Sequence, residues 1–149
     1  MRHRLSQLVF VVLVIGSGVA IGYLTPPGEW YAGLKKPAFN PPGWVFGSVW
    51  TALYAMIGVA GWRVWRRGLA VPFRTWIAQL ALNFLWSPVF FGAHRIGLAL
   101  AVVVLLLASC VAFIATAWSR DRLAALLFVP YAAWVAFAVL LNASILALN

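Results

Sequence analysis

Hydrophobic residues follow one another along the chain in five long stretches, separated by short segments that hold most of the charged residues. Each stretch has roughly the 20 residues that a helix needs to cross the hydrocarbon core of a bilayer. The stretches lack the alternation of a membrane barrel, and helices satisfy their own backbone hydrogen bonds in lipid. The pattern predicts an all-α membrane protein, one domain of residues 1–149 built as a bundle of five transmembrane helices, at about residues 5–24, 44–64, 73–91, 98–118 and 123–148.

The first stretch also resembles a secretory signal peptide, because Arg2, His3 and Arg4 precede an apolar run that contains small residues at 16–18. The apolar run nevertheless continues to Leu24. We therefore interpret it as a genuine first transmembrane helix.

Composition agrees with a membrane location, because 65% of the 149 residues are hydrophobic and only 9% are charged, against about 25% in soluble domains. The 11 Lys and Arg outnumber the 2 Asp and Glu, a balance that in a soluble protein would suggest nucleic-acid binding. Here the basic residues cluster between apolar stretches. Orientation in a bilayer explains that placement better, and no nucleic-acid partner is expected.

The basic residues are divided unequally between the two sides of the expected bundle. Eight belong to the N-terminus and to the second and fourth connections, whereas the other side has three: Lys35, Lys36 and Arg95. Under the positive-inside rule, this bias predicts a cytoplasmic N-terminus, with the connection at 25–43 and the C-terminus outside. A bacterial inner membrane is favoured, and an outer membrane stays open.

Ionisable residues are missing from the middle of every expected helix, since Glu29 and Asp121 lie in connections and His94 lies at the third turn. Ion pumps and proton-coupled transporters generally need such a residue inside the membrane. His3 and His94 come from opposite sides, so no metal site and no Ser/His/Asp chemistry is expected. The single cysteine, Cys110, excludes a disulfide framework.

Amides, hydroxyls and aromatic rings recur at helical spacing on three of the expected helices. An amide in hydrocarbon is costly without a partner, so these faces should point into the bundle. They could serve as hydrogen-bonding glue between helices or line a pocket, and three aromatic faces together favour the pocket. The faces comprise Trp50 and Tyr54, with Ser48 and Thr51 nearby; Gln79, Asn83, Trp86, Ser87 and Phe90; and Tyr131, Trp134, Ala138 and Asn142.

The nine tryptophans are divided by depth. Trp50 and Trp134 lie deeper in their helices and are the better ligand candidates. Five others are expected to anchor helix ends at the membrane–water interface, as tryptophan commonly does: Trp30, Trp62, Trp65, Trp76 and Trp118.

The connection at 25–43 is rich in proline, aromatic residues and lysine. Fixed φ angles at Pro37, Pro41 and Pro42 predict a stiff, mostly extended lid that loses little entropy on ordering. Its aromatic side chains, Trp30, Tyr31 and Phe39, could cover an apolar ligand. Lys35 and Lys36 could meet carboxylates at the rim, or simply reach lipid headgroups.

Four blocks of sequence resemble the translocator protein family, also called TspO, tryptophan-rich sensory proteins or peripheral benzodiazepine receptors. W-Y-x-x-L-x-K-P spans residues 30–37, and N-P-P at 40–42 leads into W-V-F and W-T-x-L-Y at 44–54. Q-L-x-L-N-x-L-W-S-P-V-F-F-G spans 79–92, and V-P-Y-x-x-W-x-x-F-x-x-x-L-N spans 129–142. The resemblance covers nearly the whole chain.

The resemblance implies a five-helix bundle, commonly a homodimer, with a cavity that is capped by the first connection and binds porphyrins such as protoporphyrin IX, haem-related tetrapyrroles, sterols or synthetic drugs. No cofactor is required. A cholesterol-recognition pattern of animal members is missing after Asn142, which leaves sterol binding weakly supported. The ligand-binding positions implied are Tyr31, Pro41, Pro42, Trp50, Tyr54, Asn83, Trp86, Phe90, Tyr131, Trp134 and Ala138.

The leading hypothesis is a membrane receptor or sensor that binds a porphyrin against Trp50 and Trp134. A light-dependent porphyrin-degrading enzyme is an alternative; without a conventional catalytic site, it would rely on the same two indoles. A facilitator of tetrapyrrole or lipid passage is a third possibility.

Overall fold

The computed structural model describes all residues, 1–149, and contains helices but no strand. Each of the five predicted segments is helical. The elements are α1 (Arg2–Leu24), α2 (Gly28–Ala32), α3 (Gly43–Arg66), α4 (Ala70–Ser87), the π-helix η1 (Pro88–Gly92), α5 (Ile96–Ala117) and α6 (Arg122–Leu148).

Four of the helices, α1, α3, α5 and α6, are long and apolar enough to cross a membrane. The exception among the long helices, α4, carries Arg74, Gln79 and Asn83 within its 18 residues. Pro88 has no backbone N–H with which to continue the α-helical pattern, and the chain proceeds as one turn of π-helix. The apolar stretch predicted as a single helix over 73–91 is therefore divided at Ser87.

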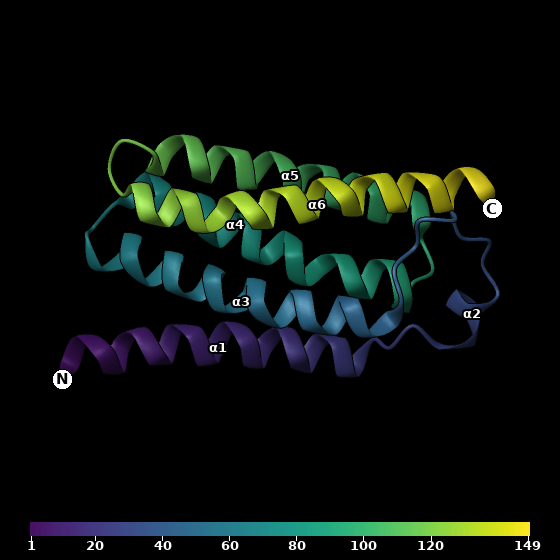
Figure 1. Cartoon of the computed structure of the whole chain (residues 1–149), viewed down its shortest axis with the longest axis horizontal. Coiled ribbons are helices and arrows are strands. Elements are labelled where there is room, and N and C mark those ends of the chain that lie inside the picture. Colours follow the sequence, from purple (N-terminus) through teal and green to yellow (C-terminus); the bar gives the residue numbers. More distant parts are fainter.

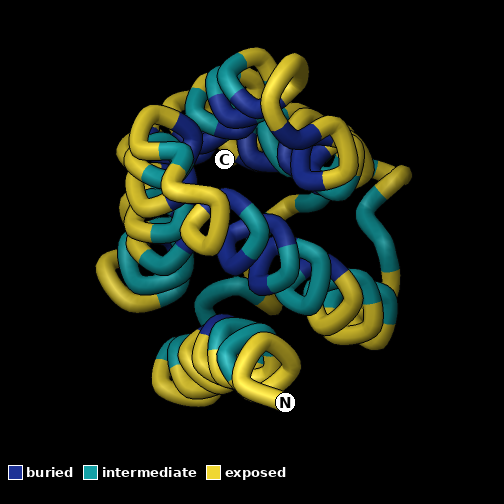
Figure 2. Tube along the Cα trace, turned by 90° about the vertical axis from the view of Figure 1, so that its left-hand side faces the viewer, coloured by how far each residue is buried: buried dark blue, intermediate teal, exposed yellow.

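The long helices lie side by side along the longest axis of the molecule (Figure 1). α2 and the connection around it lie at the same end as the C-terminus, whereas the N-terminus lies at the other end. Helix α1 is at the edge of the bundle and is mostly exposed (Figure 2), with only Val14 and Gly18 buried. The core therefore lies mainly between α3, α4, α5 and α6.

Small residues let neighbouring helices approach closely, as is common in membrane bundles. A Cβ atom built at Gly58 of α3 would lie 2.7 Å from the Cα of Val11 on α1. Gly18 of α1 faces the ring of Tyr54, and Gly61 of α3 faces the ring of Trp76, in both cases without room for a side chain.

Large aromatic residues make the contact between α5 and α6, where the rings of Phe113 and Phe128 pack with centroids 3.9 Å apart.

Two tryptophans expected at the membrane interface are instead buried, so this prediction is wrong for Trp62 and Trp76. Their side chains are 7% and 6% exposed. The indole N–H of Trp76 donates to the Ile57 carbonyl at 2.9 Å, and that of Trp62 donates to Ser6 Oγ at 2.9 Å. Nearness to a helix end did not reveal that these two rings face neighbouring helices.

The connection at 25–43 is not mostly extended, because it begins with the helical turn α2. Pro27 is the N-cap of this turn, and Glu29 lies where a negative charge is favourable. The three prolines counted as stiffening all lie after α2. There the backbone N–H of Asn40 donates to the Pro37 carbonyl in a turn, and Pro42 has extended backbone angles (φ −59°, ψ 149°).

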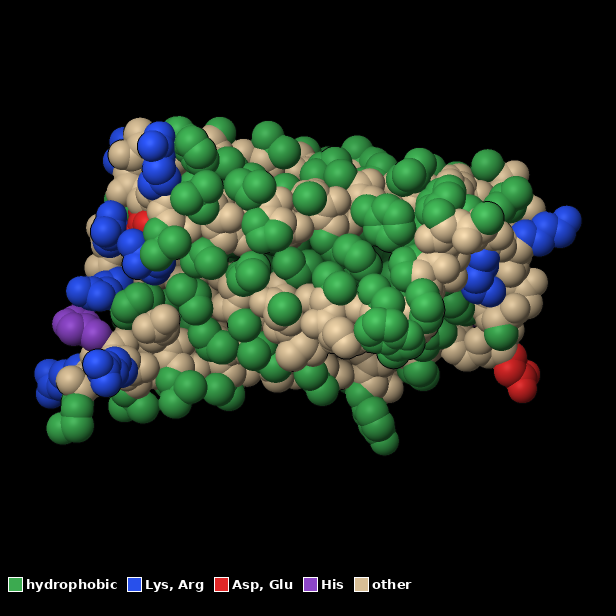
Figure 3. Space-filling model, in the orientation of Figure 1, with side chains coloured by type: hydrophobic (Ala, Val, Ile, Leu, Met, Phe, Trp, Pro, Cys, Tyr) green, Lys and Arg blue, Asp and Glu red, His purple; other side chains and the backbone are tan.

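Basic side chains gather at the end of the molecule that carries the N-terminus (Figure 3). The acidic side chain at this end, Asp121, is buried, and it accepts from the backbone N–H of Ala124 at the start of α6. Arg63 pairs with it at 3.0 Å and Arg67 at 3.2 Å. This carboxylate thus joins the ends of α3 and α6.

Candidate ligand-binding cavity

A cavity of about 530 Å³ lies in the half of the bundle nearer to α2. Its wall is formed by α1, α3, α4 with η1, α5 and α6, and by the connection before α3. The volume lies within the range of about 300–1,000 Å³ that is typical of small-molecule sites. No Asp, Glu, Lys, Arg or His side chain lines it, so it can recognise a ligand only through apolar surface, aromatic rings and neutral polar groups.

Most of the residues named from the sequence lie on this wall. The connection supplies Tyr31 and Pro41, α3 supplies Trp50 and Tyr54, and the remaining members are Asn83, Trp86, Phe90, Trp134 and Ala138. The structure thus brings together side chains that are more than 100 positions apart in the sequence.

Four named residues lie outside the wall: Pro42, Tyr131, Lys35 and Lys36. Tyr131 is completely buried behind it. The ammonium of Lys36 donates to the carbonyl of Leu34 at 3.2 Å and lies 4.5 Å from the centre of the Tyr31 ring. The backbone of Lys35 is bonded to the Asn149 side chain, through N–H and C=O at 2.9 Å each. Lys35 thus joins the connection to the C-terminus.

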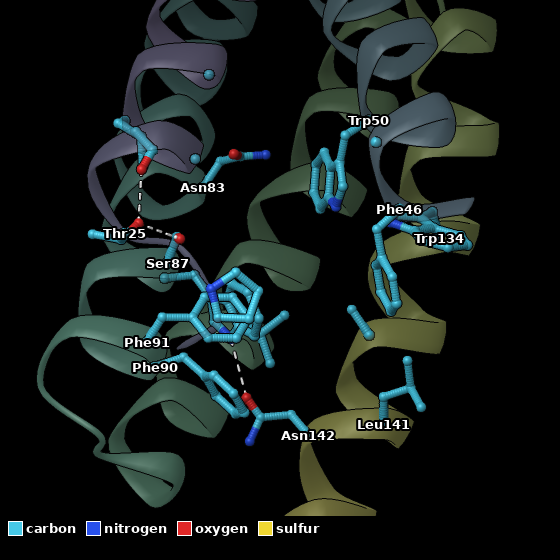
Figure 4. A pocket seen from close by; sticks show the side chains of 18 of the residues that line it. Thr25, Phe46, Trp50, Asn83, Ser87, Phe90, Phe91, Trp134, Leu141 and Asn142 are labelled. Carbon is cyan, nitrogen blue, oxygen red and sulfur yellow. Dashed lines mark hydrogen bonds between the residues drawn. The ribbon is translucent and has the colours of Figure 1, made fainter. Parts of the chain in front are cut away.

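Aromatic rings form two opposite sides of the cavity (Figure 4). On one side, Trp50 stacks on Tyr54 with centroids 5.3 Å apart, and Phe46 meets Trp134 edge to face at 5.8 Å. On the other side, Trp86 stacks on Phe90 at 4.9 Å. Such walls suit a flat, mostly apolar molecule, because offset stacking and apolar burial both act on its faces.

Hydrogen bonds behind the wall hold its polar members in place. Tyr54 donates to Asn83 Oδ1 at 3.0 Å, and Asn83 Nδ2 donates to the Tyr131 hydroxyl at 2.6 Å. Trp86 donates to Asn142 Oδ1 at 3.0 Å, and Asn142 donates to the Ile96 carbonyl at 3.0 Å. Neutral side chains that are costly to bury alone are thereby partnered.

Tyr31 holds the connection against η1 at the cavity. Tyr31 contacts Phe90 and Phe91 edge to face, at centroid distances of 6.1 and 5.3 Å, and its hydroxyl donates to Asn40 at 3.5 Å. Burial raises the pKa of the Tyr31 phenol above its ordinary value, and the bond to Asn40 offsets part of this rise. The phenol is therefore a neutral donor at physiological pH.

The other two aromatic residues expected over the ligand lie elsewhere. Trp30 stacks on His94 at 4.1 Å, and Phe39 lies 6.2 Å from Phe137, both measured between ring centroids. His94 has a positive φ of 56°, an uncommon backbone conformation for a residue with a side chain. Trp30 thus packs on the turn that follows η1.

Several wall residues were not identified from the sequence, above all those of α1. Gly18, Ile21 and Gly22 of α1 line the cavity, and so does Thr25, which caps the end of this helix. The four-residue spacing of Gly18 and Gly22 is typical of close helix contact, but this spacing does not show which helix the two glycines face. Phe46, Phe91 and Leu141 were also missed, because an apolar residue beside a motif looks the same whether it meets lipid or a ligand.

The fold and the cavity together define a class, an all-helical integral membrane protein with an aromatic cavity whose lining has no charged side chain. The sequence model of the TspO/MBR family matches residues 9–148. The chain belongs to this family, which confirms the resemblance recognised from the four sequence blocks.

Relatives come from bacteria and from animals. Protein CrtK of Rhodobacter capsulatus is 39% identical over 154 residues, which cover 97% of this chain and 95% of that protein. The tryptophan-rich sensory protein of Cereibacter sphaeroides is 42% identical over 137 residues (90% and 85%). The human translocator protein is 44% identical over 121 residues (76% and 71%).

Proposed function

We propose that this protein is a membrane receptor that binds a porphyrin or related tetrapyrrole in the aromatic cavity. The observation that carries the proposal is the pair of facing aromatic sides (Figure 4), with Trp50 and Trp134 on one and Phe90, on which Trp86 stacks, on the other. A macrocycle between them would bury both faces against rings. The name of the Cereibacter relative, a tryptophan-rich sensory protein, supports a sensing role.

The proposal includes a single domain of five membrane spans. Four of them are α1, α3, α5 and α6, and α4 with η1 together forms the remaining one. Gln79 and Asn83 of α4 are buried against other helices, whereas its exposed residues beyond Arg74 include Ile77 and Leu85. The outer surface of this segment is therefore apolar and compatible with lipid. The distribution of basic residues supports a cytoplasmic N-terminus in a bacterial inner membrane.

A dark titration with protoporphyrin IX, followed by quenching of tryptophan fluorescence in detergent, tests the binding. The native protein should saturate, and Trp134→Phe and Asn83→Ala should each weaken binding about tenfold, the effect of losing roughly 1.4 kcal/mol. Trp118→Phe is the matched control, because Trp118 is exposed at the end of α5, outside the cavity wall. Equal, non-saturating quenching in all four proteins would disprove the proposal.

Light-dependent porphyrin degradation is a second candidate, because the indoles of Trp50 and Trp134 both line the cavity. The excited porphyrin and molecular oxygen would be the reactants, with these indoles as redox partners. The test is illumination of the complex in air. New absorbing products that form faster than with free porphyrin, and more slowly in Trp50→Phe, would establish it.

Facilitated passage of a tetrapyrrole or lipid is the third candidate, supported by the name translocator protein carried by the human relative. The lack of ionisable side chains on the cavity wall favours passive over ion-coupled movement. Flux across liposomes above the protein-free rate would be required.

A homodimer is also part of the proposal, and cross-linking in membranes tests it. A sterol ligand is less well supported.

A further inference from the structure

The cavity reaches the outer surface of the bundle between α1 and α3. Its lining residues on α4, η1, α5 and α6 are all buried or half-buried, and so are Tyr31, Asn40 and Pro41 of the connection. We call the gap lined by the exposed residues of α1 and α3 the lateral opening. Apart from Pro27, the exposed lining residues are Val19 and Gly22 of α1, and Gly43, Gly47 and Thr51 of α3.

Glycines show where the close contact between α1 and α3 ends. A Cβ atom built at Gly58 of α3 would lie 2.7 Å from the Cα of Val11, and Gly18 lies against an aromatic ring of α3. At Gly22 and Gly47, which lie nearer to α2, an added Cβ atom would have no neighbouring atom within 4 Å. The two helices are therefore tightly packed as far as Gly18, and beyond it neither glycine has a side chain to fill the gap.

The lateral opening lies among uncharged residues of two membrane spans. Both α1 and α3 are long and apolar enough to cross a membrane, and the chain has no charged residue in 5–28 or 37–62. The Thr51 hydroxyl donates to the Gly47 carbonyl at 2.7 Å, and a hydroxyl that is bonded to its own helix needs no water. The opening should therefore face the hydrocarbon of the bilayer.

The side of the cavity nearer to water is covered by packed side chains. Tyr31 lies against Phe90 and Phe91, and the Lys35 backbone is bonded to the Asn149 side chain. A ligand that arrives from water must displace these contacts. A ligand that is dissolved in the bilayer meets two glycines instead.

We infer that the lateral opening is the entrance of the cavity and that the ligand arrives through it from the hydrocarbon of the bilayer. Gly22 and Gly47 keep this entrance open. The ligand class is a mostly apolar molecule that partitions into lipid, because the cavity lining has no charged side chain. The use of the entrance by a ligand rests on the proposed function, whereas access of lipid chains to the cavity does not.

Brominated lipid tests the entrance without any ligand, because bromine on an acyl chain quenches tryptophan fluorescence at short range. Trp50 is the reporter, since it lines the cavity between Gly47 and Thr51 in the sequence. Its share of the quenching is the difference between each protein and the same protein with Trp50→Phe. In vesicles of brominated phosphatidylcholine, Trp50 should be quenched in the native protein. Gly22→Phe and Gly47→Phe should each remove most of this quenching, because the new ring fills the opening.

Gly16→Phe is the matched control. Gly16 lies on the same helix as Gly22 and is exposed with open space beside it, but it is outside the cavity lining, so Trp50 should be quenched as in the native protein. Thermal unfolding shows whether each variant is folded, and the two filled positions lie on different helices, so that either one can serve. A native Trp50 that brominated lipid does not quench, or equal quenching in the filled and control variants, would overturn the inference.

Stopped-flow binding of protoporphyrin IX, dissolved beforehand in the vesicle membrane and kept in the dark, tests the route of the ligand. In Gly22→Phe, association and dissociation should both slow about tenfold, the effect of raising one shared barrier by roughly 1.4 kcal/mol. Damage to the cavity wall would instead speed dissociation. Gly16→Phe should keep both native rates.

Native rates in both filled variants would show that the ligand enters elsewhere and would overturn its use of the entrance. If protoporphyrin IX does not bind the native protein, the proposed function fails. The quenching by brominated lipid then decides by itself whether the cavity opens to the bilayer.

Discussion

Asp121 is one of only two acidic residues, and its side chain interacts with three groups: the Ala124 N–H, Arg63 and Arg67. Its side chain is 1% exposed, whereas those of its partners Arg63 and Arg67 are 24% and 51% exposed. One carboxylate therefore caps α6 and meets two guanidinium groups from the end of α3. Water screens the outer pair, so most of the stabilisation should come from Arg63 and the cap.

Asp121→Ala should accordingly destabilise the protein by about 2–4 kcal/mol, because it removes the cap and leaves a partly buried guanidinium without its partner. Asp121→Asn keeps an acceptor for the Ala124 N–H and should cost less. Unfolding in mixed micelles of increasing denaturing detergent would measure both. Glu29→Ala serves as the control, since Glu29 is exposed and makes no ion pair; equal losses in Asp121→Ala and this control would contradict the argument.

Helix α1 packs closely on α3 because the glycines at their contact have no side chain. Gly58 of α3 and Gly18 of α1 remove the atoms that would separate the two helices, and close approach yields dispersion contacts along their length. Other glycines of the same two helices, Gly16 and Gly47, face open space. The small residues of α1 and α3 are therefore not equivalent, although they look alike in the sequence.

Gly58→Ala should destabilise the protein by about 1–3 kcal/mol, because the new methyl group would lie against the backbone of Val11, which cannot move aside by rotation of a side chain. Gly16→Ala should be neutral or slightly stabilising, since alanine favours helix where space allows. The same unfolding assay compares them. A Gly58→Ala protein as stable as Gly16→Ala would mean that α1 tilts freely on α3.

At the scale of the whole molecule, the two ends differ in charge and in shape. Basic side chains gather at the N-terminal end (Figure 3), whereas the other end has the connection with α2 over the cavity. A positive end is retained on the cytoplasmic side. The cavity would then open nearer to the outer leaflet than to the cytoplasm.

Cysteine labelling in intact bacterial cells tests this orientation. In a Cys110→Ala background, a cysteine placed at the exposed Ala38 should react with a membrane-impermeant thiol reagent, whereas one at the exposed Ser119 should react only after lysis. Ser119 lies in the connection between α5 and α6, at the basic end. The opposite labelling pattern would invert the proposed topology.

Local pattern was sufficient for the family, the all-helical architecture and several aromatic side chains of the cavity wall. Continuous apolar runs allow only helices in lipid, and helical spacing placed Asn83, Trp86 and Phe90 on one face. The hydrophobic pattern also predicted a span at 73–91, although α4 by itself, with Arg74, Gln79 and Asn83, is not among the four helices that are long and apolar enough to cross a membrane.

Tertiary structure decided everything that depends on which helix a residue meets. Trp62 and Trp76 lie near helix ends but face neighbouring helices, Tyr131 lies behind the wall and not on it, and α1 forms part of the cavity. Periodicity identifies the faces of each helix but not the pairing between helices, and a hydrogen-bond chain across three helices exists only once they are packed. The sequence by itself therefore determined the kind of protein and its aromatic content, whereas packing decided which groups line the cavity and which only hold those groups in place.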